Sequence, residues 1–423
     1  MFSAPRAARR RPTPSYAPRG ENAKEVPLVK QSRTSAAPLT LLTLGHFFSD
    51  FYSNFLPALL PVLLSSLGLS LTAGGLLVMV YSFTSSILQP LCGYYIDKRG
   101  YTWLILVTLP ASALTICFST FASSYGVLVA CVAFAGLGSS VFHPLASSLV
   151  NKVTAPAKRG LAMAVFIGGG NIGFGLAPVI VIYWLLAFGA ASLPWLVVPA
   201  ALLAAAYYYF RLHQISLTPP VLPAGTGVVW YKSTSLLKLN AVMALRSWSQ
   251  MALPNFLAVW LVQQGHSPAL AGGLLTAYLL GGAVGAFVGG GLGDRFGRKA
   301  CIAGCLAVCL PAMFVFLRSP EIDLLAWVML TVSGAAMQGT LPSSIVWAQE
   351  MIPGNAAMAS GMMMGLSFGL GGLGVAITGA LADQVGLATA LLWSLAPLAA
   401  AIPLTFAIPS TRPPHRPTAA AAE

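Results

Sequence analysis

The stretch GLAMAVFIGGGNIG at residues 160–173 recurs in altered form as GMMMGLSFGLGGLG at residues 361–374, 201 positions later. Four glycines and one methionine coincide when the two stretches are aligned. The same offset relates residues 54–56 to residues 255–257, which both read Asn-Phe-Leu, and an offset of 197 relates five further positions. The chain therefore contains two copies of one unit, and a difference in loop length between the copies explains the two offsets.

Both copies are too apolar for a water-soluble fold. Apolar residues make up 57% of the chain and charged residues only 8%, whereas soluble domains carry about 25% charged residues. A chain of this composition needs lipid as its solvent, and each span needs about 20 residues to cross the hydrocarbon core. Twelve apolar stretches are long enough: 39–66, 73–96, 103–121, 125–150, 160–186, 191–210, 238–264, 269–292, 300–317, 324–349, 356–382 and 387–408.

Backbone groups in lipid must find partners within the segment, and the alternation typical of a barrel is absent, so we expect helices. The expected fold class is an all-α polytopic membrane protein with 12 transmembrane helices in two pseudo-symmetric six-helix bundles. Two such repeats are typical of a transporter whose substrate site lies between the halves. The expected domain order is a basic cytoplasmic tail at 1–37, a bundle at 38–211, a linker at 212–237, a bundle at 238–408 and a tail at 409–423.

The distribution of Lys and Arg predicts the orientation. Of the 23 basic residues, 21 fall in the two tails or in the even-numbered loops between spans. The positive-inside rule makes that face cytoplasmic, so we expect both termini in the cytoplasm. The net charge of +13 is then a topology signal, and no nucleic-acid partner is expected.

All six cysteines fall within predicted spans, and three of them recur at helical spacing. Cys301, Cys305 and Cys309 could suggest a site for a soft metal, but no His, Asp or Glu accompanies them in that segment. We therefore expect small packing residues and no metal. No Ser, His and Asp set stands beside a water-accessible motif either, so we do not expect an enzyme.

The most informative polar residues lie within the apolar spans, where an ionisable group costs about 3 kcal/mol or more. Asp50 lies near the middle of the first span, with His46 one helical turn before it and Asn54 one turn after it. His143 in the fourth span and Arg246 in the seventh lie at similar depth. We expect Asp50, His46 and His143 to carry protons.

A second group of polar residues is expected to bind the substrate. A guanidinium binds a phosphonate or carboxylate through two hydrogen bonds and stays charged when buried, so Arg246 is the expected anion site. The other residues assigned to this group are Gln250, Asn54, Asn171, Gln89 and Tyr52. Structural alternatives stay open: Asp50 could be paired with Arg246 to pin the halves together, and the histidines, Gln89, Asn171 and Tyr52 could serve helix packing.

The loops after the second and eighth spans carry a further repeated motif. It reads GYYIDKRGYTW at 93–103 and GGGLGDRFGRK at 289–299, and the first copy lacks the second basic cluster. This motif resembles the loop signature of the major facilitator superfamily. The resemblance implies that helices 1, 4, 7 and 10 line a central cavity and that the loop residues steady one conformation. These residues are Gly93, Asp97, Arg99, Gly290, Asp294, Arg295, Gly297 and Arg298.

Longer segments narrow this resemblance. LGHFFSDFYSNFLPALLPVL (44–63), AGLGSSVFHPLASSLV (135–150) and KRGLAMAVFIGGGNIGFGLAPV (158–179) look like the fosmidomycin-resistance family of bacterial efflux proteins. The resemblance implies a proton-coupled antiporter in the bacterial inner membrane that exports fosmidomycin-like phosphonates or related anions. A functional monomer is expected, with the proton gradient in place of a cofactor. The alternative is a proton- or sodium-coupled importer of a small organic anion or a sugar.

Overall fold

The computed structural model of the chain describes residues 36–155, 159–217, 233–319, 321–352, 359 and 362–409, and these residues form helices with no strand among them. The all-α fold class expected from the sequence is confirmed. The predicted tails and the predicted linker lie largely outside the described residues, so the domain boundaries stay predictions.

The first half of the chain contributes eight α-helices to the described fold. They are α1 (Ala36–Ser53), α2 (Phe55–Ser66), α3 (Leu71–Ser82), α4 (Gln89–Arg99), α5 (Thr108–Phe118), α6 (Tyr125–Val153), α7 (Arg159–Phe188) and α8 (Val198–Tyr209). A π-helical turn at Phe83–Ile87 joins α3 to α4. Short 3₁₀ segments at Thr102–Leu106 and Ala190–Val197 precede α5 and α8.

The second half contributes seven α-helices to the described fold. They are α9 (Thr234–Gln263), α10 (Pro268–Phe296), α11 (Arg298–Arg318), α12 (Leu324–Met351), α14 (Ser367–Val385), α15 (Leu387–Trp393) and α16 (Leu395–Phe406). A π-helical turn at Met362–Leu366 leads into α14.

Eleven helical stretches in the described part of the chain are long and apolar enough to cross a membrane. The remaining expected span is α9, a continuous helix of 30 residues whose apolar content is lowered by polar side chains such as Arg246, Gln250 and Asn255. These side chains are buried or half-buried, so they face protein rather than lipid. The helices are therefore consistent with the twelve predicted spans.

The first span is interrupted next to the predicted site. α1 ends at Ser53 and α2 begins at Phe55. Pro57 has no N–H to donate to the carbonyl of Ser53, so the regular helical pattern is lost there. Asn54 occupies the break, and its side-chain amide donates to the carbonyl of Phe174 at 2.8 Å, which ties the break to α7.

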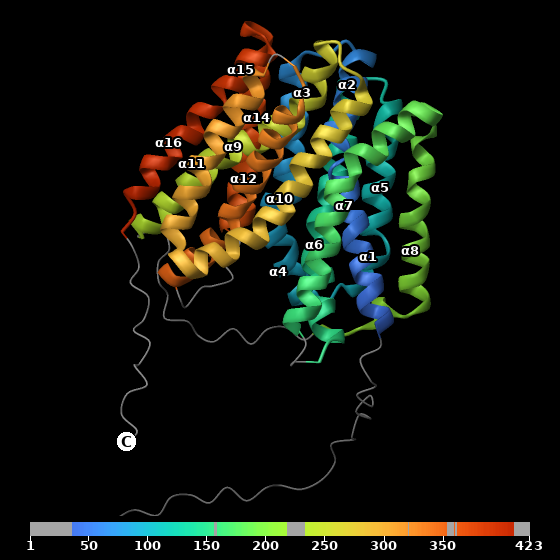
Figure 1. Cartoon of the computed structure of the whole chain (residues 1–423). Coiled ribbons are helices and arrows are strands. Elements are labelled where there is room, and N and C mark those ends of the chain that lie inside the picture. The colour runs from blue at the N-terminus through green and yellow to red at the C-terminus, as the bar shows by residue number, and fades with distance from the viewer. Residues whose placement is uncertain are drawn as a thin grey trace, which may run out of the picture. The chain divides into compact units, whose positions relative to one another are not determined.

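The two halves meet where α3 packs on α14 and where α7 packs on α10, pairs that are equivalent in the two repeats (Figure 1). Glycines let these backbones approach: a Cβ atom on Gly75 would lie 2.7 Å from the carbonyl oxygen of Val375. On the other side, a Cβ atom on Gly175 would lie 2.5 Å from the Leu280 side chain. Gly75 lies near the start of α3, so the structure is closed at the end of the molecule where α3 begins and α14 ends.

Candidate functional site

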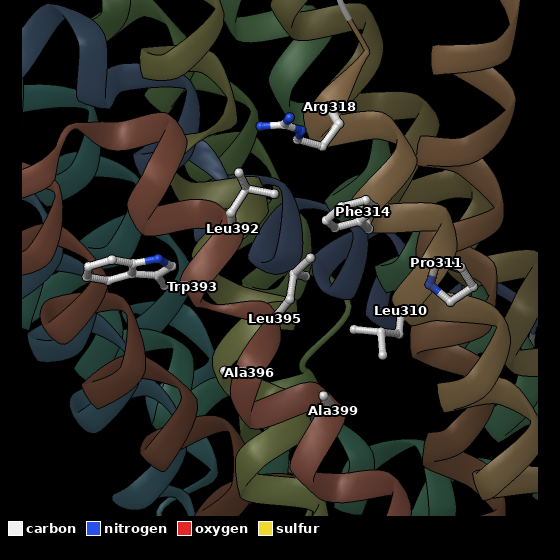
Figure 2. Close-up of a pocket in the computed structure, with 9 residues that line it drawn as sticks. All are labelled: Leu310, Pro311, Phe314, Arg318, Leu392, Trp393, Leu395, Ala396 and Ala399. Atoms are coloured by element: carbon white, nitrogen blue, oxygen red, sulfur yellow. The ribbon is translucent and has the colours of Figure 1, made fainter.

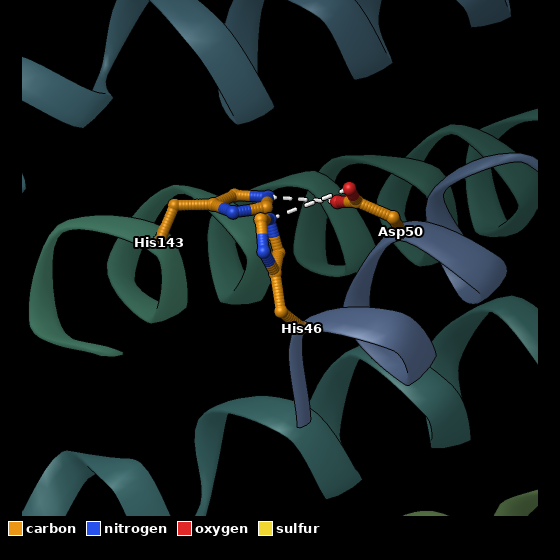
Figure 3. Close-up of side chains that lie close together, drawn as sticks. All are labelled: His46, Asp50 and His143. Carbon is orange, nitrogen blue, oxygen red and sulfur yellow. Dashed lines mark ion pairs between the residues drawn. The ribbon is translucent and has the colours of Figure 1, made fainter. Parts of the chain in front are cut away.

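His46, Asp50 and His143 lie together in the interior of the first half, as Figure 3 shows. His46 Nε2 lies 3.3 Å from Asp50 Oδ2, and His143 Nε2 lies 3.3 Å from Asp50 Oδ1. His46 and Asp50 share one face of α1 because they are four residues apart, and α6 supplies His143. The three residues predicted to carry protons therefore form one group, which we call the acid–histidine cluster.

The second ring nitrogen of His46 restricts where protons can lie in this cluster. Nδ1 lies 2.8 Å from the carbonyl oxygen of Phe166 on α7, and because a carbonyl only accepts, Nδ1 carries a proton. If His46 is neutral, Nε2 presents a lone pair, and its contact with Asp50 is favourable only when the carboxyl group is protonated. If Asp50 is ionised, His46 must be the doubly protonated cation. In both cases a favourable contact requires one additional proton on the pair, compared with a neutral His46 beside an ionised Asp50.

The two histidines differ in their access to solvent. The side chain of His46 is 10% exposed and that of His143 is 23% exposed. The Phe166 ring also stacks on the His46 imidazole at a centroid distance of 4.1 Å, so His46 is held on two sides. Apart from Asp50, His143 has no hydrogen-bond partner among the described residues. His143 is therefore the more exposed imidazole of the cluster and has fewer described contacts.

Gly170 of α7 forms a wall of the acid–histidine cluster. A Cβ atom at this position would lie 2.4 Å from Asp50 Oδ2 and 2.7 Å from His46 Cε1. A Cβ atom on Gly168, half a turn earlier on the same helix, would meet no atom within 4 Å. Gly170 thus sets the position of the carboxylate, whereas Gly168 does not.

The donor atoms of the cluster lie within 4.8 Å of one another, which is close enough for them to hold a metal ion. Two imidazoles and a carboxylate are also a donor set that transition metals accept. A proton satisfies the contact between His46 and Asp50 without a metal. The absence of a metal stays a prediction.

Arg246 lies at a separate site in the second half of the chain, and it is fully buried. Its Nε donates to the carbonyl of Met337 at 3.0 Å, and its Nη2 donates to Oε1 of Gln338 at 3.1 Å. Gln250, one turn along α9, donates from Nε2 to the same oxygen of Gln338 at 2.6 Å. Gln338 of α12 thus joins the two predicted substrate residues, and we call this group the arginine–glutamine site.

The arginine–glutamine site holds a cation without a balancing anion among the described residues. No described carboxylate forms an ion pair with Arg246, and no described group accepts a hydrogen bond from its Nη1. The hydroxyl of Tyr278 on α10 and Oε1 of Gln250 also lack described hydrogen-bond partners. An unpaired buried charge is costly, so an anionic ligand is the group that would complete this site.

The ion pairs of Asp50 bear on the alternative in which it pins the two halves together. Both of its described ion pairs are to histidines of its own half, and Arg246 bonds instead to α12. A pairing of Asp50 with Arg246 therefore gains no support from this conformation.

The other polar residues assigned to the substrate contact the protein itself or lack a described partner. Tyr52 is 1% exposed, and its hydroxyl donates to the carbonyl of Leu196 at 2.7 Å, which does not support direct contact with a substrate. Asn54 is bonded to α7, as described above. Gln89 and Asn171 are half-buried and make no hydrogen bond with another described residue. The substrate role of these four residues stays a prediction.

The second copy of the loop motif forms an ionic network. Arg298 Nη1 lies 2.6 Å from Asp294 Oδ1, and Arg298 Nε lies 3.7 Å from a carboxylate oxygen of Glu350 at the end of α12. Gly297 separates α10 from α11 with a φ of +90°, a conformation that favours glycine. Arg295 is exposed and stacks over the ring of the next residue. The network ties this loop to α12.

The first copy of the loop motif repeats the packing but not the described ion pairs. Gly93 lies against Pro144 of α6, as Gly290 lies against the equivalent proline of α12. Arg99 is exposed at the end of α4. The Asp97 side chain lies outside the described part of the structure. Whether the first copy forms a matching network therefore stays a prediction.

Sequence reasoning missed three residues of these two sites. Gln338 lies in the middle of the tenth span, a helix that the family resemblance places at the cavity, so its polar side chain was a usable signal. Phe166 acts through its backbone carbonyl and Gly170 through the absence of a side chain. A backbone carbonyl gives no signal in the residue type. Gly170 is one of the repeated glycines, but the repeat does not place it against Asp50.

A groove of about 660 Å³ lies away from both sites, between α11 and the α15–α16 segment (Figure 2). Apart from Arg318 at one end, its lining is apolar. Phe314 and Trp393 in the lining are about half exposed, which is typical of a surface covered by lipid chains. We therefore do not place an anion site there.

A family model described as Major Facilitator Superfamily matches residues 42–262 and 239–423. The chain is 32% identical over 397 residues to the uncharacterized MFS-type transporter YfnC of Bacillus subtilis (strain 168), a match that covers 92% of this chain and 96% of that relative. It is 28% identical over 367 residues to the fosmidomycin resistance protein of Escherichia coli (strain K12), covering 84% of this chain and 89% of that relative.

Solved transporter structures share the fold at low identity. A bacterial homologue of the human lysosomal transporter Spinster, in an inward-facing and occupied conformation, matches with a TM-score of 0.72 at 16% identity, over 88% of this chain and 96% of that chain. The nucleoside transporter NupG matches with a TM-score of 0.69 at 16% identity, over 88% of this chain and 98% of that chain. With its helical membrane spans, its duplicated halves and these matches, the chain belongs to the major facilitator superfamily, as a fosmidomycin-resistance-like multi-pass membrane transporter.

Proposed function

We propose that this transporter is a proton-coupled antiporter that exports small anionic compounds, with fosmidomycin-like phosphonates as the first class to test. The observation that carries the proposal is the carboxylate of Asp50 held between two imidazoles in the membrane interior. Ionisable groups at such depth are typical of proton relays in transporters. The relation to a fosmidomycin resistance protein supports export, and the unpaired guanidinium of Arg246 supports an anionic substrate.

In the proposed cycle, the cluster exchanges its proton through His143. This imidazole is the more exposed of the two, so it can take a proton from water and pass it to Asp50. His46 keeps its Nδ1 proton on the carbonyl of Phe166 and offers Nε2 to Asp50. Loss of the extra proton leaves the Nε2 lone pair of His46 facing the Asp50 carboxylate, both on α1. Separation of these two side chains would disturb the bond from His46 Nδ1 to the carbonyl of Phe166 and so act on α7.

α7 then connects the cluster to the second half. Gly170 of α7 lies against the cluster, and Gly175 on the same helix packs on Leu280 of α10. Gly282 of α10 lies against the side chain of Gln338, because a Cβ atom on Gly282 would lie 3.4 Å from Gln338 Cβ. A shift of α7 on deprotonation would therefore reach the arginine–glutamine site through α10.

The substrate anion would bind Arg246 in exchange for Gln338. Nη1 has no described partner, and Nη2 is engaged by Gln338, whose oxygen is shared with Gln250. Rotation of the Gln338 amide toward Gln250 frees both terminal nitrogens for two oxygens of a phosphonate or carboxylate. Paired hydrogen bonds of this kind give geometric selectivity as well as affinity.

The setting of the protein forms part of the same proposal. The relation to a fosmidomycin resistance protein of Escherichia coli supports a bacterial inner-membrane location, and the positive-inside rule supports cytoplasmic termini. In that orientation the halves are in contact at the outer end, so the structure corresponds to an inward-facing state. The transporter would work as a monomer, with the proton gradient in place of a cofactor.

The direction of coupling tests the proposal. Everted membrane vesicles containing the protein are loaded at acidic internal pH and offered fosmidomycin outside. An antiporter takes up the drug while the vesicle interior is acidic and stops when an ionophore collapses the pH difference. Concentration of an organic anion or sugar in intact cells, with no uptake by acid-loaded everted vesicles, would instead establish the importer. Uptake driven by sodium at equal pH would overturn proton coupling.

A further inference from the structure

A carboxylate of the second half caps a helix of the first half at the closed end of the molecule. Asp383, near the end of α14, accepts hydrogen bonds from the backbone N–H groups of Leu71 and Thr72, both at 2.8 Å. The hydroxyl of Thr72 donates to the same carboxylate at 2.5 Å. Both oxygens of Asp383 are therefore used by the first turn of α3.

The chemistry of a helix N-terminus explains this contact. The first N–H groups of a helix have no partner within the helix and carry partial positive charge, so a carboxylate there is favoured. The side chain of Ser70, the N-cap residue of α3, satisfies the N–H of Ala73. The N–H groups of the first two helical residues are satisfied by Asp383 instead. The capping of α3 is thus completed only when the two halves are in contact.

The backbones beneath this cap are also in close contact. A Cβ atom on Gly379, one turn before Asp383, would lie 2.3 Å from the carbonyl oxygen of Leu71. A Cβ atom on Gly75, one turn into α3, would lie 2.7 Å from the carbonyl oxygen of Val375. The cap therefore stands at the outer rim of a seam that runs along α3 and α14, and separation of the seam must break it.

The equivalent seam between α7 and α10 lacks this cap. The offset of 197 residues places Pro268 at the position of Leu71, and proline has no N–H to donate. The offset of 201 places Ile182 at the position of Asp383, and its side chain packs against Gly272. One seam is therefore closed at its rim by charge-assisted hydrogen bonds, whereas the contact described at the equivalent rim, between Ile182 and Gly272, is apolar.

We propose that Asp383 is the gate residue of the α3–α14 seam: its cap stabilises the state closed at this end and must be broken before the halves can open there. Asp383 contacts neither the acid–histidine cluster nor the arginine–glutamine site, so it acts as a positioning residue. The proposal rests on membership of the transporter family and on these contacts. It depends on neither the coupling ion nor the substrate.

Hydrogen exchange measured by mass spectrometry on the purified full-length protein tests this gate. In Asp383→Asn, the amide cannot accept from all three donors, and we expect about a tenfold rise in the open population, equivalent to about 1.4 kcal/mol. Exchange should rise in the first turns of α3 and also in the facing stretch of α14 around Val375. Thr72→Val, which removes only the hydroxyl contact, should give a smaller rise in both places. Glu321→Gln, the same acid-to-amide change at an exposed residue outside both seams, is the matched control and should leave both stretches unchanged.

A purely local cap gives a different result. If exchange rises only in the first turn of α3 while α14 keeps its protection, Asp383 caps a helix and does not control the seam. Unchanged exchange in both helices also overturns the proposal. A general loss of stability is recognised in two ways. It lowers the thermal unfolding temperature of the variant, and it raises exchange in α6 and α12 as well as at the seam.

Discussion

The two halves of this transporter share a fold but carry different chemistry at equivalent positions. The 201-residue offset pairs His46 and Asp50 of the first half with Ser247 and Met251 of the second half, so the second copy has no titratable pair there. Within the helices that carry Pro144 and the equivalent Pro342, the offset is 198, and His143 corresponds to a leucine. All three members of the acid–histidine cluster therefore belong to one repeat only.

The converse holds for the arginine–glutamine site. Arg246 corresponds to Gly45, which lies against the hydroxyl of Tyr207 and leaves no room for a side chain. Gln338 corresponds to Ser140, whose hydroxyl bonds within its own helix. The duplicated helices supply a common frame, whereas the acid–histidine cluster and the arginine–glutamine site each occur in one copy only. The proposed coupling between the two sites would then pass through the contacts between the halves.

Substitution of Asp50 should produce the largest effect, because it removes the carboxylate that both histidines of the acid–histidine cluster contact. Asp50→Asn keeps the shape, and its amide N–H can donate to Nε2 of His46 as a protonated acid would. We expect pH-driven transport to fall about 100-fold or more, with the fold retained and downhill substrate exchange within about threefold of the parent. Transport by proteoliposomes with and without a pH difference measures this, with the exposed Glu321→Gln as control. A stable Asp50→Asn that still pumps against a gradient removes Asp50 from the proton site.

Arg246 tests whether the second half recognises an anion by geometry or by charge alone. Arg246→Lys retains the charge but cannot donate to Met337 and Gln338 while offering two further N–H groups to a ligand. We expect both Arg246→Lys and Arg246→Ala to weaken binding of the anionic substrate at least about tenfold, or about 1.4 kcal/mol. Calorimetric titration of the purified variants provides the measurement. Full binding by the lysine variant would mean that Arg246 is only a positive charge near the site.

Three glycine substitutions test the difference between the two halves, with smaller expected effects than those at Asp50 and Arg246. Gly170→Ala forces a methyl group against Asp50 and His46, so we expect about a tenfold loss of pH-driven transport with little change in substrate binding. Gly168→Ala on the same helix meets open space and should have no effect. Gly371→Ala, the equivalent in the second half, crowds Ser247 and Met251 and should lower stability without shifting the pH dependence. An equal shift of pH dependence in Gly170→Ala and Gly371→Ala would show that crowding, rather than the cluster, sets the effect.

The fold and the acid–histidine cluster could be predicted from the sequence, whereas the surroundings of Arg246 could not. Apolar length and the two offsets predict the helices and their duplication, because both follow from composition and spacing. The acid–histidine cluster was also predictable, since His46 and Asp50 are one turn apart and ionisable groups in lipid must find partners. The direction in which Arg246 points was not predictable. Its depth matches that of Asp50, and only the packing of α9 on α12 places it against Gln338.

The roles that sequence reasoning missed depend on backbone groups, which nearly every residue offers, or on the missing side chain of a glycine. The carbonyl of Phe166 fixes the proton arrangement of His46, and any residue offers a carbonyl. Asp383 sits near a helix end that reads as an ordinary loop boundary, and its partner is the backbone of a helix about 310 residues away. Such contacts follow from the approach of two backbones, which residue types alone do not specify.

The smallest effect is expected at the C-terminal end of each half's last helix, where different residues donate to the terminal backbone carbonyls. Lys299 at the start of α11 donates to the carbonyls of Phe406 and Ile408, both at 2.8 Å, and so holds the end of α16. At the 197-residue equivalent, the hydroxyl of Thr102 donates to the carbonyl of His213 at 2.8 Å, beyond the end of α8.

A cation near a helix C-terminus contributes about 0.3–1 kcal/mol. A neutral hydrogen bond contributes about 0.5–1.5 kcal/mol but carries no charge to interact with the helix dipole. Lys299→Met should therefore lower the apparent melting temperature in detergent by about 1–2 °C, and added salt should reduce the difference from the parent. Thr102→Val should give a shift of similar size that salt does not change. Neither variant should alter transport, and a loss of transport in Lys299→Met alone would mean that the end of α16 takes part in the conformational cycle of the second half.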